Sequence, residues 1–146
     1  MAMLQITPQH TILLAVHPVD FRSGIDGLAA LCKQTLIQDP FSGTLFVFTN
    51  KKRQHIKIIV FDGKGFWLIT RRFSQGKLAW WPTEAATAHE LTATELQILL
   101  AQGMPHAVHI PDDWRPLKPL VARAAYSVSP VQGSLGTSKA AIAQDF

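Results

Sequence analysis

Three short apolar segments that follow one another closely place the strongest limit on the fold of this 146-residue chain. The segments are residues 45–49, 55–61 and 66–72, and they are joined by a polar loop (50–54) and an Asp-Gly-Lys-Gly turn (62–65). Parallel neighbours need a crossover of about a dozen residues, so segments joined this closely pair antiparallel. The sequence therefore predicts a β-meander, which a short fourth strand around residues 78–80 extends.

Two helices and one further strand are expected around the meander. An apolar strand at 11–16 stops at Pro18, and a helix then begins with Ser23 as its cap. The apolar face of this helix follows the helical spacing, and Asp39-Pro40 ends it. That face consists of Ile25, Leu28, Ala29, Cys32 and Leu36.

A second helix is expected over residues 92–102. Thr92 is a typical N-cap, Glu95 stands three residues later as in a capping box, and Gly103 is a typical left-handed stop. The segment between Pro82 and this helix is rich in alanine and threonine and is interpreted as a linker. The predicted fold class is α+β: an antiparallel meander of about four to five strands packed with two helices.

Length and composition favour a single α+β domain over residues 1–103, followed by a proline- and serine-rich extension at 104–146. We expect this extension to be largely disordered, above all the tail at 127–146. The lone cysteine, Cys32, excludes an internal disulfide and is expected to be a buried thiol. The longest apolar run near the start, 12–16, is too short to span a membrane, which favours a cytoplasmic protein.

Positive charge is concentrated in the meander. Between residues 44 and 80 there are eight basic residues against the single acid Asp62, whereas the other parts of the chain carry six basic and nine acidic residues. A local field of one sign attracts polyanions, and phosphate backbones are the commonest polyanion in a cell. The charge pattern therefore favours nucleic-acid binding.

The meander also predicts where these cations meet. Alternate connectors of a meander lie at the same end of the sheet, so the loop 50–54 should lie beside the turn 74–76. If Phe61 pairs with Phe66, then Ile56 pairs with Arg71 and His55 with Arg72. Six cations would then share one rim, with Lys57 and Arg22 behind them. The six are Lys51, Lys52, Arg53, Arg71, Arg72 and Lys77.

Other interpretations of the same residues stay open at this stage. Charges at sheet edges and turn tips also protect edge strands against aggregation, although mixed signs would serve that purpose. The aromatic residues among the cations are expected to be mainly core, with base stacking as an alternative. Trp80 and Trp81 are adjacent and would face opposite sides of a strand, so one of them is a candidate for partner binding.

Catalysis is not expected, and no catalytic residue, metal site or cofactor is predicted. Asp62 and Glu95, with Asp20 or Asp26, could form a two-metal carboxylate triad. Each of these carboxylates has a structural explanation, as a turn residue, a capping-box partner or a residue at a helix start. A metal site at His106 and His109, with Asp112 and Asp113 behind them, is a weaker alternative.

The chain resembles the accessory proteins of bacterial insertion sequences of the sixty-six type, called TnpB or Orf2 proteins. The resemblance rests on motifs that run in unbroken order through about residues 10–103. These are Val19-Asp20-Phe21-Arg22-Ser23-Gly24-Ile25-Asp26-Gly27-Leu28-Ala29, Asp39-Pro40-Phe41-Ser42-Gly43, Leu45-Phe46-Val47-Phe48, Asn50-Lys51-Lys52-Arg53, Ile56-Lys57-Ile58, Asp62-Gly63, Gly65-Phe66-Trp67-Leu68, Arg71-Arg72, Trp81-Pro82, Leu91-Thr92, Glu95-Leu96 and Leu99-Leu100.

The resemblance implies a small protein that contributes to transposition beside a separate transposase. Together with the charge pattern, it leads us to expect a non-enzymatic accessory factor that binds DNA, in duplex form and with low intrinsic specificity. Its other expected partners are the transposase and further proteins of the same element. The alternative is a protein-interaction module that docks on the transposase through Trp80, Trp81 and the second helix without binding DNA.

Overall fold

The structure is a computed structural model, and it describes residues 6–7, 9–107, 111–115 and 117. The chain divides into two units, Met1–Asp112 and Asp113–Phe146. The tail expected to be disordered, residues 127–146, lies outside the described residues. The division expected after residue 103 therefore stays a prediction.

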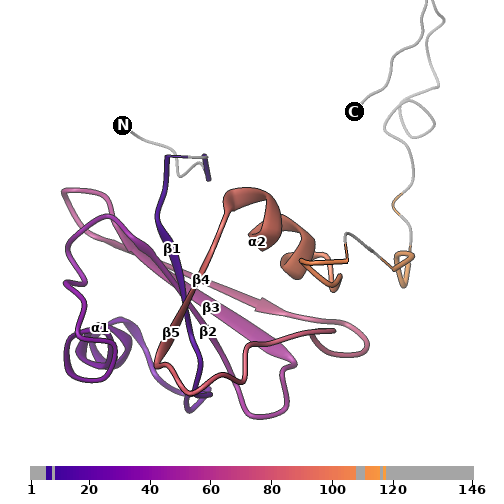
Figure 1. The fold of residues 1–146 in the computed structure, drawn as a ribbon, viewed down its shortest axis with the longest axis horizontal. Coiled ribbons are helices and arrows are strands. Elements are labelled where there is room, and N and C mark those ends of the chain that lie inside the picture. Colours follow the sequence, from indigo (N-terminus) through magenta and orange to yellow (C-terminus); the bar gives the residue numbers. More distant parts are fainter. Residues whose placement is uncertain (1–5, 8, 108–110, 116, 118–146) are drawn as a thin grey trace, which may run out of the picture. The chain divides into compact units, whose positions relative to one another are not determined.

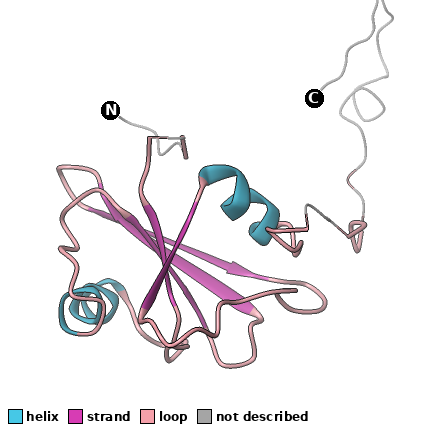
Figure 2. Ribbon diagram, viewed as in Figure 1, coloured by secondary structure: helices cyan, strands magenta, loops and turns pink. Residues whose placement is uncertain are grey.

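The described part of the first unit contains five strands and two helices (Figure 2). Their order is β1 (Ile12–Ala15), α1 (Ile25–Gln34), β2 (Leu45–Thr49), β3 (His55–Phe61), β4 (Phe66–Arg72), β5 (Ala88–Leu91) and α2 (Ala93–Leu100). This arrangement confirms the predicted α+β class.

The strands form one sheet in the order β4-β3-β2-β1-β5. β2, β3 and β4 are consecutive antiparallel neighbours, as the short connectors predict. β1 pairs in parallel with β2 and antiparallel with β5. The parallel pair is possible because the long connection through α1 leaves room for a crossover.

Each face of the sheet carries its own apolar core, and Figure 1 shows α1 and α2 on opposite sides of the strands. The α1 face packs Leu28 and Cys32 against Phe46 and Phe48 of β2. The α2 face packs Leu96 and Leu99 against residues of β1, β2 and β3 such as Val47. The alternation along β2 divides its side chains between the two cores, so β2 is buried on both faces.

The assignment of the outer strands differs from the prediction. Residues 78–80 are not a strand, because the amide of Leu78 bonds to the carbonyl of Arg53 outside any ladder. The fifth strand is instead β5, which lies in the segment interpreted as a linker and pairs with β1 far away in the sequence. Its non-local partner explains why local composition did not reveal it.

The helix ends also differ in part. α1 begins after Gly24, with no side-chain cap bond, so the prediction of Ser23 as the cap is wrong. At α2 the capping box of Thr92 and Glu95 is confirmed. The left-handed residue after α2 is Gln102 (φ 62°) and not Gly103, whose amide bonds to the carbonyl of Ile98 at 2.9 Å.

Gln102 has a structural reason to adopt this unusual conformation. Its side-chain amide donates to the carbonyl oxygens of Gln75 and Lys77, at 3.1 and 3.2 Å. The end of α2 is therefore fastened to the turn at 74–77. A glycine at position 102 would supply the backbone conformation without these two bonds.

Candidate nucleic-acid interface

The two connectors expected to be neighbours are joined by backbone hydrogen bonds at one end of the sheet. The amide of Leu78 donates to the carbonyl of Arg53 at 2.9 Å, and the amide of Phe73 donates to the carbonyl of Gln54 at 3.1 Å. The predicted pairing of loop 50–54 with the turn after β4 is therefore confirmed.

The loop 50–54 is held in shape by its first residue. The side-chain oxygen of Asn50 accepts from the amides of Gln54 and His55, at 2.9 and 3.2 Å, while its carbonyl accepts from the amide of Arg53. Arg53 adopts a left-handed conformation (φ 59°). The exposed side chains of Lys51 and Lys52 thus stand on an internally bonded turn rather than on a loose loop.

The strand register agrees with the prediction, since Ile56 pairs with Arg71 and His55 with Arg72. Adjacent residues of a strand face opposite sides, so Arg71 and Arg72 do not share a face. Arg71 lies on the α2 side, where its Nη1 donates to the carbonyl of Leu100 at 2.6 Å and its guanidinium lies 5.2 Å from the ring centre of Phe73. Arg72 lies on the α1 side and is exposed.

Lys57 is engaged inside the molecule. Its Nζ donates to the carbonyl oxygens of Phe21 and Ser23, at 2.5 and 2.6 Å, just before α1 begins. These bonds connect β3 to the chain segment that enters α1. We therefore assign Lys57 a structural contact, although it was one of the predicted phosphate ligands.

Arg22 is also paired, with Asp20. Its Nη2 lies 2.9 Å and its Nε 3.2 Å from the two carboxylate oxygens, and the side chain of Arg22 is 88% exposed. The hydrogen bonds from Arg22 lower the pKa of Asp20 from 3.8 to about 2, and Asp20 raises the pKa of Arg22. The pair carries no net charge at neutral pH.

Five predicted cations have no side-chain hydrogen bond or ion pair among the described residues, unlike Arg22, Lys57 and Arg71, and we refer to these five together as the basic end. All except the half-buried Arg53 are exposed. They come from the loop 50–54, the last residue of β4 and the turn that follows it. The basic end consists of Lys51, Lys52, Arg53, Arg72 and Lys77.

Two aromatic residues beside the basic end were missed at the level of sequence. The rings of Phe21 and His55 lie 4.0 Å apart between centres, with their planes tilted by 34°. Burial, together with the charges of Arg72 and Lys57, lowers the pKa of His55. Its Nδ1 is buried without a hydrogen-bond partner among the described residues. The sequence offered one signal for this surface: a large aromatic residue, Phe21, stands between two charged residues, Asp20 and Arg22.

The two tryptophans proposed for partner binding have different environments. Trp81 is buried at 4% exposure, and its indole nitrogen donates to the carbonyl oxygens of Ala15 and Val16. It is a core residue and offers no surface to a partner in this fold. Trp80 is half-buried, and its ring meets His89 and His106 edge-on.

The candidate catalytic carboxylates have the structural roles expected of them. The side chain of Asp62 accepts from the amides of Lys64 and Gly65 and from the indole of Trp67, and these bonds lower its pKa. Glu95 accepts from the amide of Thr92, which lowers its pKa. No cluster of three metal-ligating side chains occurs among the described residues, and His109 lies outside them.

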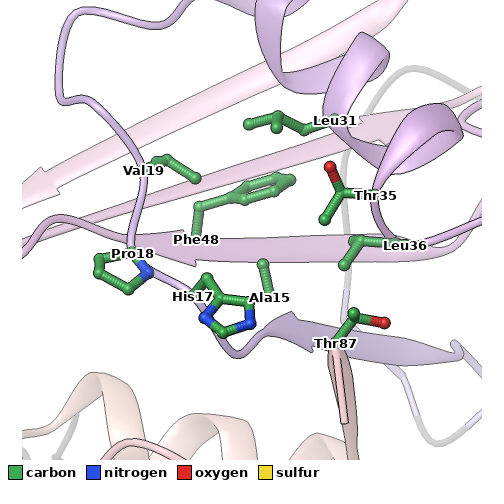
Figure 3. A pocket seen from close by; sticks show the side chains of 9 residues that line it. All are labelled: Ala15, His17, Pro18, Val19, Leu31, Thr35, Leu36, Phe48 and Thr87. Atoms are coloured by element: carbon green, nitrogen blue, oxygen red, sulfur yellow. The ribbon is translucent and has the colours of Figure 1, made fainter.

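A small apolar pocket lies between α1 and the sheet, with a volume of about 60 Å³. Figure 3 shows Phe48 among the lining side chains, with Leu31 of α1 and Leu36, which follows α1, on one side and His17 and Pro18 on another. Its volume suffices for a small apolar group and is too small for a nucleotide. No lysine or arginine lines this pocket, so the pocket is not part of the basic end.

The fold and the charge distribution define a class of small α+β protein with a cationic sheet end. The family described as IS66 Orf2 like protein matches residues 10–109, and the chain belongs to this family. Membership indicates an accessory role associated with transposition, as the resemblance of the sequence implied.

Two curated relatives from Sinorhizobium fredii are similar to the chain, and both are described as uncharacterized proteins. One, y4jC, is 37% identical over 90 residues, which cover 62% of this chain and 76% of the relative. The other, y4hO, is 32% identical over 107 residues, which cover 73% of this chain and 90% of the relative. No solved structure matches the chain.

Within the part of the chain that the structure describes, no helix is long and apolar enough to cross a membrane.

Proposed function

We propose that the chain is a non-enzymatic accessory factor in transposition, which binds DNA through its basic end and assists a separate transposase. One observation carries this proposal: the hydrogen bonds of Arg53 and Gln54 to the segment after β4 gather five cations at one end of the sheet. Lysine and arginine contacts to phosphates supply affinity and position but little sequence information. Low intrinsic specificity follows, with the site of action chosen by the transposase or by other proteins of the element. The proposed compartment is the cytoplasm.

The number of cations predicts the salt dependence of binding. Each phosphate that is neutralised on duplex DNA contributes about 0.9 to the slope of log affinity against log salt, so five contacts predict a slope of about −4.5. The triple variant Lys51→Gln, Lys52→Gln, Lys77→Gln should reduce the slope to about −2. Fluorescence anisotropy with one generic duplex at several salt concentrations measures both values.

Lys64→Gln is the matched control, because Lys64 is exposed on the turn at the opposite end of β3 and β4. The slope measured for Lys64→Gln should differ from that of the unaltered protein by less than about 0.5, which is half the contribution of one phosphate contact. Duplex binding that does not respond to salt, or an equal effect of Lys64→Gln and the triple variant, would contradict the proposal.

Docking on the transposase without DNA binding is the second candidate function. Trp80 supports it, because this ring is half-buried beside the exposed His106, whereas the burial of Trp81 weighs against it. The two functions give different results in the same titration. A complex with DNA that forms only when transposase is added favours docking, and binding by the isolated chain favours the DNA-binding proposal.

A further inference from the structure

An exposed phenylalanine lies at the same end of the sheet as the cations. The amide of Val19 donates to the carbonyl of Thr49 at 2.9 Å, which brings the segment 19–23 beside the last residue of β2 and the start of the loop 50–54. Phe21 lies in this segment and is 43% exposed. A single exposed apolar side chain is common on protein surfaces, so the groups around this ring decide what it can bind.

The ring of Phe21 is held in place rather than left to rotate freely. His55 lies 4.0 Å from it between ring centres, and Nζ of Lys57 lies 5.0 Å from its centre. The same Nζ bonds to the carbonyl of Phe21 itself. A ring that is already ordered loses little conformational entropy when a second flat group binds to it.

The ring of Phe21 is contacted from β3 and is still partly open to water. His55 and Lys57 are two residues apart on β3, so both project from the same side of the sheet and reach the ring from there. These two contacts leave 43% of Phe21 exposed. The exposed part of the side chain is the surface that a further flat group would contact.

The phosphates of a nucleotide stacked on Phe21 would lie near cations at the same end of the sheet. Arg72 pairs with His55 in the strand register and lies on the same face of the sheet. Lys51 and Lys52 stand on the loop that begins after Thr49. Arg22 and Asp20 neutralise each other, so phosphate contacts fall to Arg72 and the loop lysines.

We propose that Phe21 is a stacking platform for an unpaired nucleobase, with the adjacent phosphates held by the basic end. This inference rests on the proposed function and specifies the form of DNA that is bound. A base inside a duplex is already stacked on both sides, whereas an unpaired base has a free face for an aromatic ring. Single-stranded DNA and single-stranded RNA share this chemistry, and the 2′-hydroxyl distinguishes them.

The chain provides a matched control at the opposite end of the sheet. Phe41 is 57% exposed and also packs against aromatic rings, with Phe61 at 5.0 Å and Phe66 at 5.2 Å between centres. These partners flank the turn at 62–65, far along β3 from His55. Phe41→Leu therefore makes the same chemical change as Phe21→Leu away from the basic end.

The test compares binding of the full chain to a 12-nucleotide oligo-dT, to oligo-rU of the same length and to a generic duplex, by fluorescence anisotropy at one salt concentration. Phe21→Leu should weaken binding to the single strands by about tenfold and duplex binding by less than about twofold, because only the stacked base is lost. Phe21→Trp should bind single strands at least as well as the unaltered protein. Phe41→Leu should change neither affinity.

A second readout detects stacking directly and does not depend on Phe21→Leu being well folded. An oligonucleotide that carries a fluorescent 2-aminopurine should lose emission when it binds the unaltered protein or Phe21→Trp. Equal weakening of single-strand and duplex binding by Phe21→Leu, or unchanged emission with the unaltered protein and Phe21→Trp, overturns the stacking proposal. In that case salt-dependent duplex binding would still support the proposed function, whereas failure to bind any DNA overturns both proposals.

Discussion

The amide nitrogen of Leu78 lies 2.9 Å from the carbonyl oxygen of Arg53. This bond connects a buried residue of the α2 face to a left-handed arginine in the loop 50–54. Together with the meander of β2, β3 and β4, it places side by side two basic segments that are separated by all of β3 and β4. The charge distribution of the sheet end thus depends on a main-chain contact, which substitution of the cationic side chains leaves intact.

Lys57 and Lys51 should have opposite phenotypes. Lys57→Met removes two charged hydrogen bonds to the carbonyls of Phe21 and Ser23 and should lower the free energy of unfolding by about 1 to 2 kcal/mol. Lys51→Met alters an exposed turn residue and should change the free energy of unfolding by less than about 0.5 kcal/mol. Urea denaturation measures both, and duplex affinity should fall mainly in Lys51→Met. The reverse ranking in both assays would refute this assignment.

The carboxyl of Asp20 should titrate at about pH 2 in the folded protein, below its ordinary value of 3.8. Because the folded pKa is the lower one, the stabilisation is fully present above pH 4 and is lost as the pH falls toward 2. Carboxyl chemical shifts measured by NMR against pH provide the test. In Arg22→Gln the midpoint should return toward 3.8, and an unchanged midpoint would show that Arg22 is not the cause.

Cys32 should not react in the folded state. Burial raises the pKa of its thiol from 9.0 to about 12, and the residue has no exposed surface. Labelling with a disulfide reagent at pH 8 should therefore require unfolding and should follow the urea transition. Since the folded pKa is the higher one, this contribution to stability is complete below pH 9 and declines as the pH rises toward 12. Rapid labelling of the native chain would be inconsistent with this burial.

The capping box at the start of α2 should contribute measurably to stability. Thr92→Ala removes the acceptor for the amide of Glu95, at 3.1 Å, and should cost about 1 kcal/mol. Thr94→Ala, an exposed change within the same helix, is the control and should have little effect. Thermal or urea unfolding distinguishes the two variants. Equal stability of both variants would mean that the cap is not needed.

The meander could be predicted because its information is local. The Asp62-Gly63 turn fixes the β3–β4 register, and Gly63 adopts the left-handed conformation (φ 98°) that such a turn requires. β5 could not be predicted in this way, because its residues gain their strand structure from β1, more than seventy positions earlier. Likewise, the left-handed Gln102 depends on contacts with Gln75 and Lys77 that sequence patterns do not show.

The basic end was predicted in its location and only in part in its composition. Loop pairing follows from meander geometry, so the meeting of Lys51 to Arg53 with the turn near Lys77 was accessible from the sequence. Adjacent strand residues face opposite sides, so the separation of Arg71 from Arg72 was also accessible from the sequence, although the prediction placed both on one rim. The internal contacts of Lys57 were not accessible, because they depend on how the segment before α1 folds over β3.

β1 is synthesised first among the strands, yet it occupies an interior place in the sheet, between β2 and β5. A nascent chain that has emerged only as far as β4 can pair β1 on one side and leaves its other side without a partner. The sheet is complete only after residue 91 has left the ribosome. Translation of this protein therefore includes an interval in which β1, an apolar strand, has only one of its two neighbours, and α2 can cover its face of the completed sheet only after that interval.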